Sequence, residues 1–329
     1  MLKKTEGTNM RADLQQYCEQ YIVNRDAVKS TLKMANGYMY PVCANLFLSR
    51  GMEARAERLE ECRAVLKEKT GIFSNFRSLL QAPVICMLSM TENPEAELEK
   101  ALASYEQMKK EFMASDYLVL AALLLPGGED MAHIVARGKE IYRRMRKEHP
   151  FLTSSEDSVY ALMMAASEKS DDALMMDMEE GYALLKRRFG AGNPVQAISH
   201  MLALQAANPR LNAGRVCELF DEIERIGGKY GKYYELPTLA ALAMMEGDLR
   251  QVAADIMEAD AFLAGQKGYG FFGMGKKMRL MHAAMIVSCA RGARSGMDAA
   301  VISSTLAMVI AQQAAAAAAA AGAAAAVSN

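Results

Sequence analysis

The chain has 329 residues, of which 52% are hydrophobic, and its 38 lysines and arginines almost balance its 39 aspartates and glutamates. A net charge of −1 excludes a global field that would draw the protein to nucleic acid or anionic lipid, so any charged partner has to be recognised locally. The length suits either two ordinary domains or one elongated array.

The N-terminal segment begins MLKKTEGTNM and lacks the apolar core of a signal peptide, and the six cysteines include no C-x-x-C pair. Both features predict a cytoplasmic protein whose reduced cysteines pack as small hydrophobes. Residues 10–34 predict a helix that caps the N-terminal end of the fold.

From there the chain alternates between two kinds of helical segment. Short segments that are apolar nearly all round predict buried helices. They lie near residues 40–48, 78–88, 117–125, 158–166, 194–204 and 236–245. Longer segments with apolar residues at i, i+3, i+4 and i+7 predict half-exposed helices between them. No segment alternates with period two, so no sheet is expected.

The half-exposed segments carry a regularly spaced marker. Large apolar residues recur at Tyr105, Tyr142, Tyr182, Phe220 and Met257, at intervals of 37, 40, 38 and 37 residues. This spacing predicts a helical hairpin repeated six or seven times with a period of about 39 residues, an α-solenoid-like array. Met257 keeps the interval but lacks the ring, which indicates that the array changes there.

Basic residues follow the marker in successive segments. Arg143 and Arg144 follow Tyr142, and Lys186 and Arg187 follow Tyr182. If the repeats stack regularly, these residues form a ridge that suits an acidic partner, phosphate groups or RNA. Favourable interaction with the helix dipole explains the same residues without any ligand.

A glycine-rich connection at residues 227–237 is dense in tyrosine and lysine. Lys229, Tyr230, Lys232, Tyr233 and Tyr234 are candidates for partner binding, because tyrosines beside cations suit protein contacts. The alternative is that Tyr233 or Tyr234 anchors the next apolar helix.

A second glycine-rich stretch, residues 268–277, contains G-x-G-x-x-G at Gly268, Gly270 and Gly273. A dinucleotide or phosphate loop of this kind needs a preceding strand, whereas an amphipathic helix precedes this one. Lys277 also occupies the place of the magnesium-binding Ser or Thr. The stretch is therefore interpreted as a connection between repeats.

The sequence gives no catalytic, metal or cofactor site. The four histidines lack metal-ligand spacing, and His200 lies on an apolar segment as a core histidine would. Residues 299–329 are uncharged and rich in alanine, ending QQAAAAAAAAGAAAAVSN. They predict a terminal helix that docks through a few aliphatic residues; a partner-binding helix and a membrane anchor are the alternatives.

Several stretches resemble the bacterial family called domain of unknown function 4003. They are TGIFSNFRSLLQAP, YRRMRKEHPFLTSSEDSVYALMMA, ISHMLAL and the alanine-rich end, so the likeness covers most of the chain. The resemblance implies a cytosolic bacterial protein and brings no activity, substrate or catalytic residue.

We therefore expect an all-α helical-repeat domain at residues 1–298 and an alanine-rich tail at residues 299–329. The expected function is non-catalytic protein–protein interaction in the cytoplasm, without a cofactor and without nucleic acid. One alternative is a small-molecule-binding or enzymatic protein with a groove near residues 227–277. The other is a membrane-associated adaptor held by the tail.

Overall fold

The structure, a computed structural model, describes residues 10–33, 37–125, 127–128, 130–204, 208–269 and 274–295. Across these residues the chain forms fourteen α-helices and one short 3-10 helix, η1 (Asn75–Arg77), and no strand. The all-α prediction is confirmed. The alanine-rich tail lies outside the described residues, as do Gly270 and Gly273.

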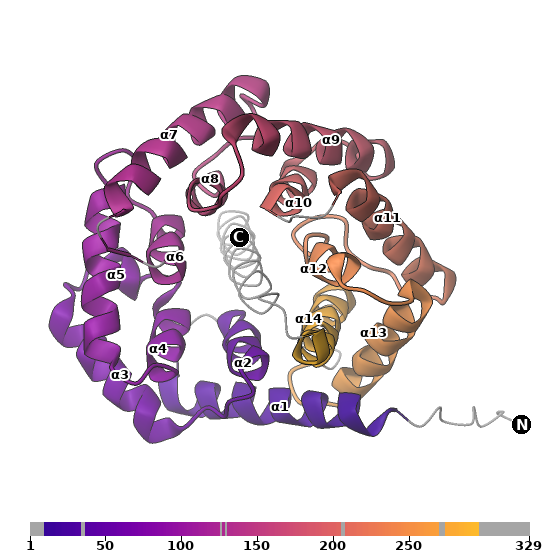
Figure 1. Ribbon diagram of the computed structural model, residues 1–329. Helices are drawn as coiled ribbons and strands as arrows, with labels where there is room; N and C mark the ends of the chain where they lie inside the picture. Colours follow the sequence, from indigo (N-terminus) through magenta and orange to yellow (C-terminus); the bar gives the residue numbers. More distant parts are fainter. Residues whose placement is uncertain are drawn as a thin grey trace, which may run out of the picture.

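The helices alternate between an outer and an inner layer around a ring (Figure 1). The outer helices are α1 (Ala12–Leu32), α3 (Ala56–Lys69), α5 (Pro94–Met108), α7 (Met131–Glu148), α9 (Asp171–Phe189), α11 (Pro209–Arg225) and α13 (Leu249–Ala264). The inner helices are α2 (Met39–Ser49), α4 (Gln81–Ser89), α6 (Asp116–Leu124), α8 (Asp157–Ala165), α10 (Asn193–Leu204), α12 (Thr238–Met244) and α14 (Lys276–Ser295).

Composition explains which helix enters which layer. Inner helices such as α2, α4 and α6 are apolar on nearly every side, and every residue of α2 except its last, Ser49, is buried. Outer helices bury one stripe: in α7 it includes Ile134, Gly138, Ile141 and Met145, at helical spacing, while the basic residues stay outside. The core is the apolar layer between the two sets of helices.

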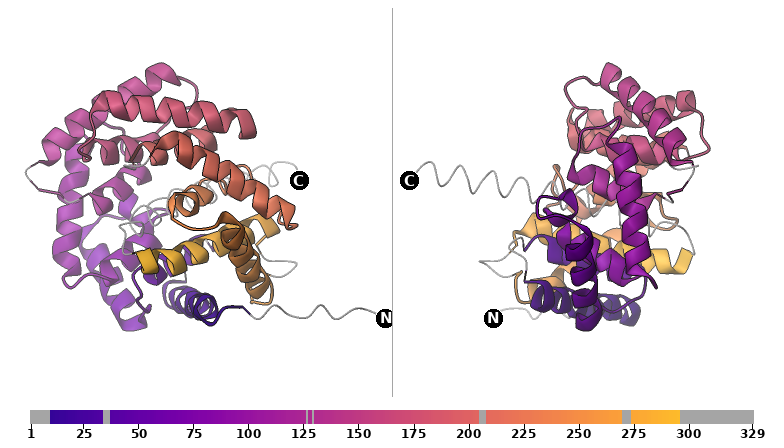
Figure 2. Two further views of the ribbon diagram at one scale, coloured as in Figure 1. Left: turned by 45° about the vertical axis from the view of Figure 1, so that its right-hand side comes forward. Right: turned by 90° about the vertical axis from the view of Figure 1, so that its left-hand side faces the viewer.

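The array closes on itself. Helix α14 packs against α2, and α1 packs against both α13 and α14, so the first and last hairpins are neighbours (Figures 1 and 2). A solenoid-like array is therefore not confirmed, because the ends of an open array stay apart. Helix α1 is the outer helix of the first hairpin and not a cap on an open end.

The spaced marker residues lie on the outer helices, at the seams between hairpins. Each aromatic marker packs against a ring that precedes it by about thirty residues, from the previous unit. The pairs are Phe76 with Tyr105, Phe112 with Tyr142, His149 with Tyr182, and Phe189 with Phe220, with ring centroids 5.3, 5.7, 4.4 and 5.1 Å apart. Three of the pairs are edge-on and His149–Tyr182 is tilted, and such ring packing stabilises each seam beyond its buried area.

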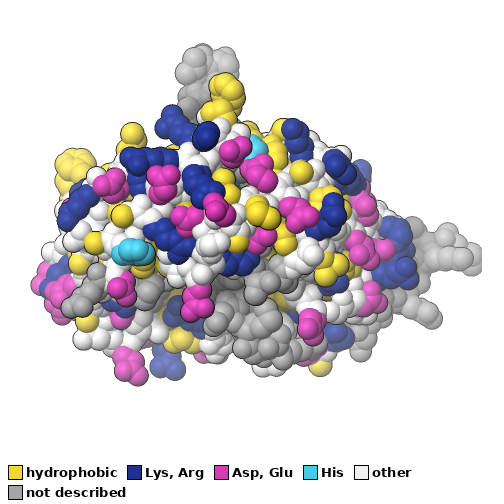
Figure 3. All heavy atoms as spheres, turned by 45° about the horizontal axis from the view of Figure 1, so that its top comes forward, with side chains coloured by type: hydrophobic (Ala, Val, Ile, Leu, Met, Phe, Trp, Pro, Cys, Tyr) yellow, Lys and Arg dark blue, Asp and Glu magenta, His cyan; other side chains and the backbone are white. Residues whose placement is uncertain are grey.

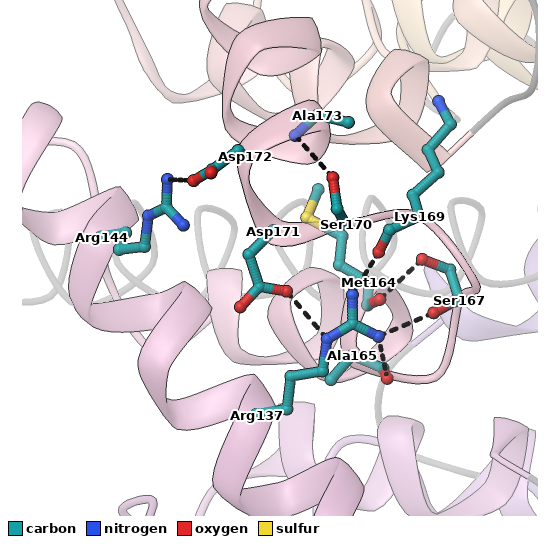
Figure 4. A network of polar contacts seen from close by, with 10 residues as sticks. All are labelled: Arg137, Arg144, Met164, Ala165, Ser167, Lys169, Ser170, Asp171, Asp172 and Ala173. Atoms are coloured by element: carbon teal, nitrogen blue, oxygen red, sulfur yellow. Dashed lines mark hydrogen bonds and ion pairs between the residues drawn. The ribbon is translucent and has the colours of Figure 1, made fainter.

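Arginines join the two layers at the ends of inner helices. Arg137 of α7 donates to the carbonyl oxygens of Ala165, Ser167 and Lys169 and to Asp171 Oδ1 at 2.8 Å (Figure 4). These carbonyls lie at the last residue of α8 and just after it, where helical hydrogen-bond partners run out. The guanidinium thereby satisfies the end of the helix.

Similar arginine–carbonyl hydrogen bonds occur two repeats before and two repeats after Arg137. Arg58 donates to two carbonyls after α4, and Arg215 donates to three at the end of α12. Arg58, Arg137 and Arg215 are spaced by 79 and 78 residues, twice the period inferred from the markers. The repeat is therefore also present in the hydrogen bonds between arginines of outer helices and the ends of inner helices.

The inner helices begin on one face of the ring. Asn75, before α4, donates to Asp116 at the start of α6 at 3.2 Å, and Asn193 at the start of α10 donates to Glu156, before α8, at 3.0 Å. We call this side, which carries the described residues of the outer-to-inner connections, the N-face. The described residues of the inner-to-outer connections lie on the opposite face (Figures 1 and 2).

Candidate functional site

The basic residues predicted to form a ridge are largely engaged within the protein. Arg144 pairs with Asp172 of the next outer helix at 2.7 Å (Figure 4), and Arg143 lies 3.6 Å from Glu140 in its own helix. Lys186 lies over the ring of Tyr182, 5.8 Å from its centroid. Arg143 remains 65% exposed, and Lys186 and the neighbouring Arg187 are exposed as well.

The tyrosine-rich connection divides into buried and exposed parts. Tyr230 is buried and shares a hydrogen bond with Thr238, while Tyr234 is half-buried. Lys232 lies over the ring of Phe220, 5.2 Å from its centroid. Tyr233, 68% exposed, and Lys229 are the parts that face solvent. Anchoring and surface display therefore both occur, in different residues of the same connection.

A cavity of about 320 Å³ lies on the N-face where the ring closes. The α1–α2 hairpin supplies one wall and the α13–α14 connection supplies the other. Its lining residues are Arg25, Lys29, Gly37, Tyr38, Tyr40, Pro41, Lys267, Gly268, Tyr269 and Met274. We call it the closure pocket; nearly 240 residues of sequence separate its two walls.

The lining of the closure pocket is cationic. Arg25, Lys29 and Lys267 line it, and no Asp or Glu does. Arg25 is 7% exposed, lies over the Tyr269 ring and pairs with Asp26, an exposed residue just outside the lining, at 2.8 Å. Lys29 and Lys267 make no ion pair with any described residue. A pocket with this lining attracts an anion.

A buried hydrogen-bond chain supports the pocket wall. The hydroxyls of Tyr21 and Tyr269 lie 3.1 Å apart, and the Tyr269 hydroxyl lies 2.8 Å from His282 Nδ1. Burial, and then the nearby Arg25, lowers the pKa of His282 to about 3, so its neutral ring accepts from Tyr269. Burial raises the pKa of Tyr269 to about 12. The chain therefore holds Tyr269 in one position as a neutral hydroxyl.

A smaller cavity, of about 220 Å³, lies on the opposite face around the ends of α4 and α6. It contains an opposite-charge pair, Lys100 and Glu97, 3.8 Å apart, beside leucines of α6. Arg50 also lines this cavity, which thus has two cations and one carboxylate, whereas three cations and no carboxylate line the closure pocket.

The buried His200 lies where a core histidine was predicted. It is 2% exposed, its Nδ1 is 3.2 Å from Asp157 Oδ1, and its ring packs against Tyr160. Among the described residues, no group of three or more His, Cys, Asp or Glu is arranged to hold a metal ion. In the same part of the chain, no helix is both long and apolar enough to cross a membrane.

Residues in one wall of the closure pocket could be predicted from the sequence, whereas those in the other wall could not. Lys267 and Gly268 fall within the groove proposed near residues 227–277, and Gly268 adopts φ +93°, which favours glycine. Arg25 and Lys29 were assigned to a capping helix. Their periodic positions in α1 contain no signal for a pocket, because the partner wall is distant in sequence.

Comparison with known proteins gives a family without an assigned role. The chain is 25% identical over 245 residues to the uncharacterized protein YeaA of Bacillus subtilis (strain 168), covering 71% of this chain and 74% of that protein. No solved structure matches the chain. The family model described as "Protein of unknown function (DUF4003)" matches residues 24–315, and the chain accordingly belongs to the DUF4003 family.

Proposed function

We propose that the protein binds a small phosphate-bearing molecule in the closure pocket. The observation that carries this proposal is the convergence of three cations, without a lining carboxylate, on one cavity. A cavity of about 320 Å³ lies at the lower end of the range for small-molecule sites. The ligand therefore is a nucleotide-sized molecule or smaller.

Phosphate fits this lining better than a single carboxylate does. Arg25 already donates to Asp26 through Nε and Nη2. The lining cations without an ion-pair partner among the described residues are therefore Lys29 and Lys267, and a dianion uses their two point charges more fully than a monoanion does. Tyr38, Tyr40 and Tyr269 give the pocket aromatic surface for the rest of the ligand. The proposal is a binding function and assigns no catalytic residue.

Ligand binding is expected to raise the melting temperature of the protein. Adenosine 5′-diphosphate and inorganic pyrophosphate at 100 times their dissociation constants are expected to stabilise the native state by about 2.7 kcal/mol. The double variant Lys29→Ala/Lys267→Ala is expected to bind about tenfold more weakly, a loss of about 1.4 kcal/mol. Differential scanning fluorimetry and isothermal titration calorimetry measure both quantities.

The matched control is Lys276→Ala/Lys277→Ala, which removes the same charge from exposed residues outside the pocket lining. This variant should bind both ligands as the wild type does. Equal affinity in the pocket variant and the wild type, or no binding of either ligand, would contradict the proposal. Stronger binding of citrate than of pyrophosphate would shift the ligand class to carboxylates.

Protein–protein interaction in the cytoplasm is our second proposal, with the outer surface as the contact. Its support is the exposure of Arg143 on the outer helix α7, 65%, and of Lys186 and Arg187 on the next outer helix, α9. Replacing Arg143, Arg144, Lys186 and Arg187 with glutamate is expected to remove partners captured from cell extract. An unchanged set of captured proteins, identified by mass spectrometry, would count against this contact.

A further inference from the structure

The two faces of the ring differ in charge and in aromatic content. The outer-to-inner connections span residues 33–38, 70–80, 109–115, 149–156, 190–192, 226–237 and 265–275. Their described residues include seven Lys or Arg, three Glu and nine aromatic residues. The described residues of the inner-to-outer connections include three Lys or Arg, six Asp or Glu and no aromatic residue. In the described residues, cations thus exceed acids on the N-face, and acids exceed cations on the opposite face.

Large apolar side chains also stand out from the N-face. Phe73 and Phe151 are 95% and 98% exposed, and Ile72, Met113 and Tyr233 are 71%, 85% and 68% exposed. These five come from four different connections. On the opposite face, the exposed large hydrophobic residue in the described connections is Met52, at only 37%. Among the described connections, the strongly exposed apolar residues therefore lie on the N-face; others, such as Met176 and Leu211, lie on outer helices.

Cations accompany these side chains. Lys229 and Lys267 on the N-face are exposed, and Lys109 and Lys110 precede Met113 in its connection. Figure 3 brings the α7 and α9 side of the ring forward, and hydrophobic side chains stand out beside Lys and Arg side chains along its upper edge. Apolar tips and cations are thus interspersed and do not form separate patches.

We propose that the N-face docks on an anionic membrane surface. Phe73, Phe151 and Met113 would enter the interfacial region of the bilayer, where rings and aliphatic groups both gain by leaving water. The surrounding lysines would meet lipid phosphates. Such docking needs no membrane-crossing helix, because the protein lies on the surface.

The arrangement of the tips favours a membrane over other anionic partners. The five side chains come from four separate connections and are 68–98% exposed, so they do not enclose a groove for a peptide. Single-stranded nucleic acid uses planar rings as stacking platforms, but Ile72 and Met113 offer no planar surface. A fluid interface accepts separate, chemically mixed tips without requiring a defined complementary shape.

Co-sedimentation with vesicles tests the docking proposal. The full chain is expected to sediment with vesicles of 70% phosphatidylcholine and 30% phosphatidylglycerol, and not with pure phosphatidylcholine vesicles, at 0.1 M salt. The double variant Phe73→Ser/Phe151→Ser is expected to bind at least tenfold more weakly. Because both side chains are almost fully exposed, its melting temperature should stay that of the wild type.

The matched control is Met176→Ser/Leu211→Ser, which removes two exposed apolar residues, 71% and 62%, from the outer helices α9 and α11. It should bind vesicles as the wild type does. The proposal is overturned if the wild type ignores the anionic vesicles, or if the two double variants bind alike. Binding of polyuridylate that depends on Phe73 and Phe151, without vesicle binding, would overturn it in favour of nucleic acid.

Membrane docking and ligand binding in the closure pocket can be tested independently. The Phe73→Ser/Phe151→Ser variant leaves every lining residue of the pocket in place, so it should bind adenosine 5′-diphosphate in solution as the wild type does. Loss of vesicle binding with retained ligand binding therefore identifies the face. Loss of both would indicate a general structural fault.

Discussion

Replacing Asp255 with alanine is expected to lower the free energy of unfolding by about 3–5 kcal/mol, because it leaves buried positive charge without its partner. The Asp255 side chain is 1% exposed and accepts from Arg11 and Arg291, both at 3.1 Å. Arg11 directly precedes α1, and Arg291 lies in α14. One carboxylate on α13 therefore joins the start of α1 to α14, the first and last described helices, where the ring closes. Urea unfolding followed by circular dichroism measures the loss.

An exposed aspartate provides the control. Asp172 also pairs with an arginine of a neighbouring outer helix, Arg144, but it is 86% exposed. Asp172→Ala is expected to cost no more than about 1 kcal/mol. The double variant Asp255→Ala/Arg291→Leu should recover part of the loss, since it removes the buried cation together with its partner. If Asp255→Ala costs no more than Asp172→Ala, the carboxylate does not hold the closure.

Local periodicity is the part of the fold that sequence could predict. The marker spacing located the outer helices because the seams between hairpins repeat, and each seam needs a large side chain at the same place. The break at Met257 has a structural reason. Its neighbour is Gly228, where an added Cβ would lie 3.0 Å from Met257 Sδ and 2.4 Å from Ile223 Cγ2. The seam there is filled by close backbone approach and not by a second ring.

Closure of the ring could not be predicted in the same way. The contacts that join the ends, Arg11 with Asp255 and Tyr21 with Tyr269, link residues 244 and 248 positions apart. Whether an array of hairpins closes depends on small rotations between units that accumulate around the ring. The sequence of a single segment does not indicate this accumulated rotation. For the same reason the closure pocket could not be predicted from the sequence, although the glycine-rich stretch that forms one of its walls indicated a groove.

The basic ridge shows why charge patterns alone could not define a site. Lys186 follows Tyr182 at one helical turn, which suits both a ligand and a cation over a ring, and the structure has the second arrangement. Arg188 likewise bonds Asp221 and Glu224 of the next outer helix, at 2.7 and 3.0 Å. These acids are more than thirty residues away, so their neutralising effect was not visible in the local sequence.

Replacing His282 with asparagine is expected to flatten the pH dependence of stability below neutral pH. In the native state the pKa of His282 is lowered to about 3, whereas a histidine in the unfolded chain has its ordinary pKa of about 6.5. The unfolded chain therefore binds more protons between these limits. Stability due to this ring is complete above about pH 6.5 and is lost as the pH falls toward about 3.

For the wild type, this residue alone should cost about 2 kcal/mol of stability between pH 7 and pH 5. Asparagine cannot take up that proton, and its Oδ1 retains an acceptor for the Tyr269 hydroxyl. Chemical unfolding of both proteins at several pH values gives the free energy of unfolding as a function of pH. Carboxylates present in both proteins contribute equally to the two slopes, so the difference between the slopes reports His282 alone. His133→Asn, at an exposed position, should keep the wild-type slope. Parallel stability curves for the wild type and His282→Asn would show that the native ring takes up its proton at the same pH as the unfolded chain, so that it does not stay a neutral acceptor beneath the closure pocket at pH 5.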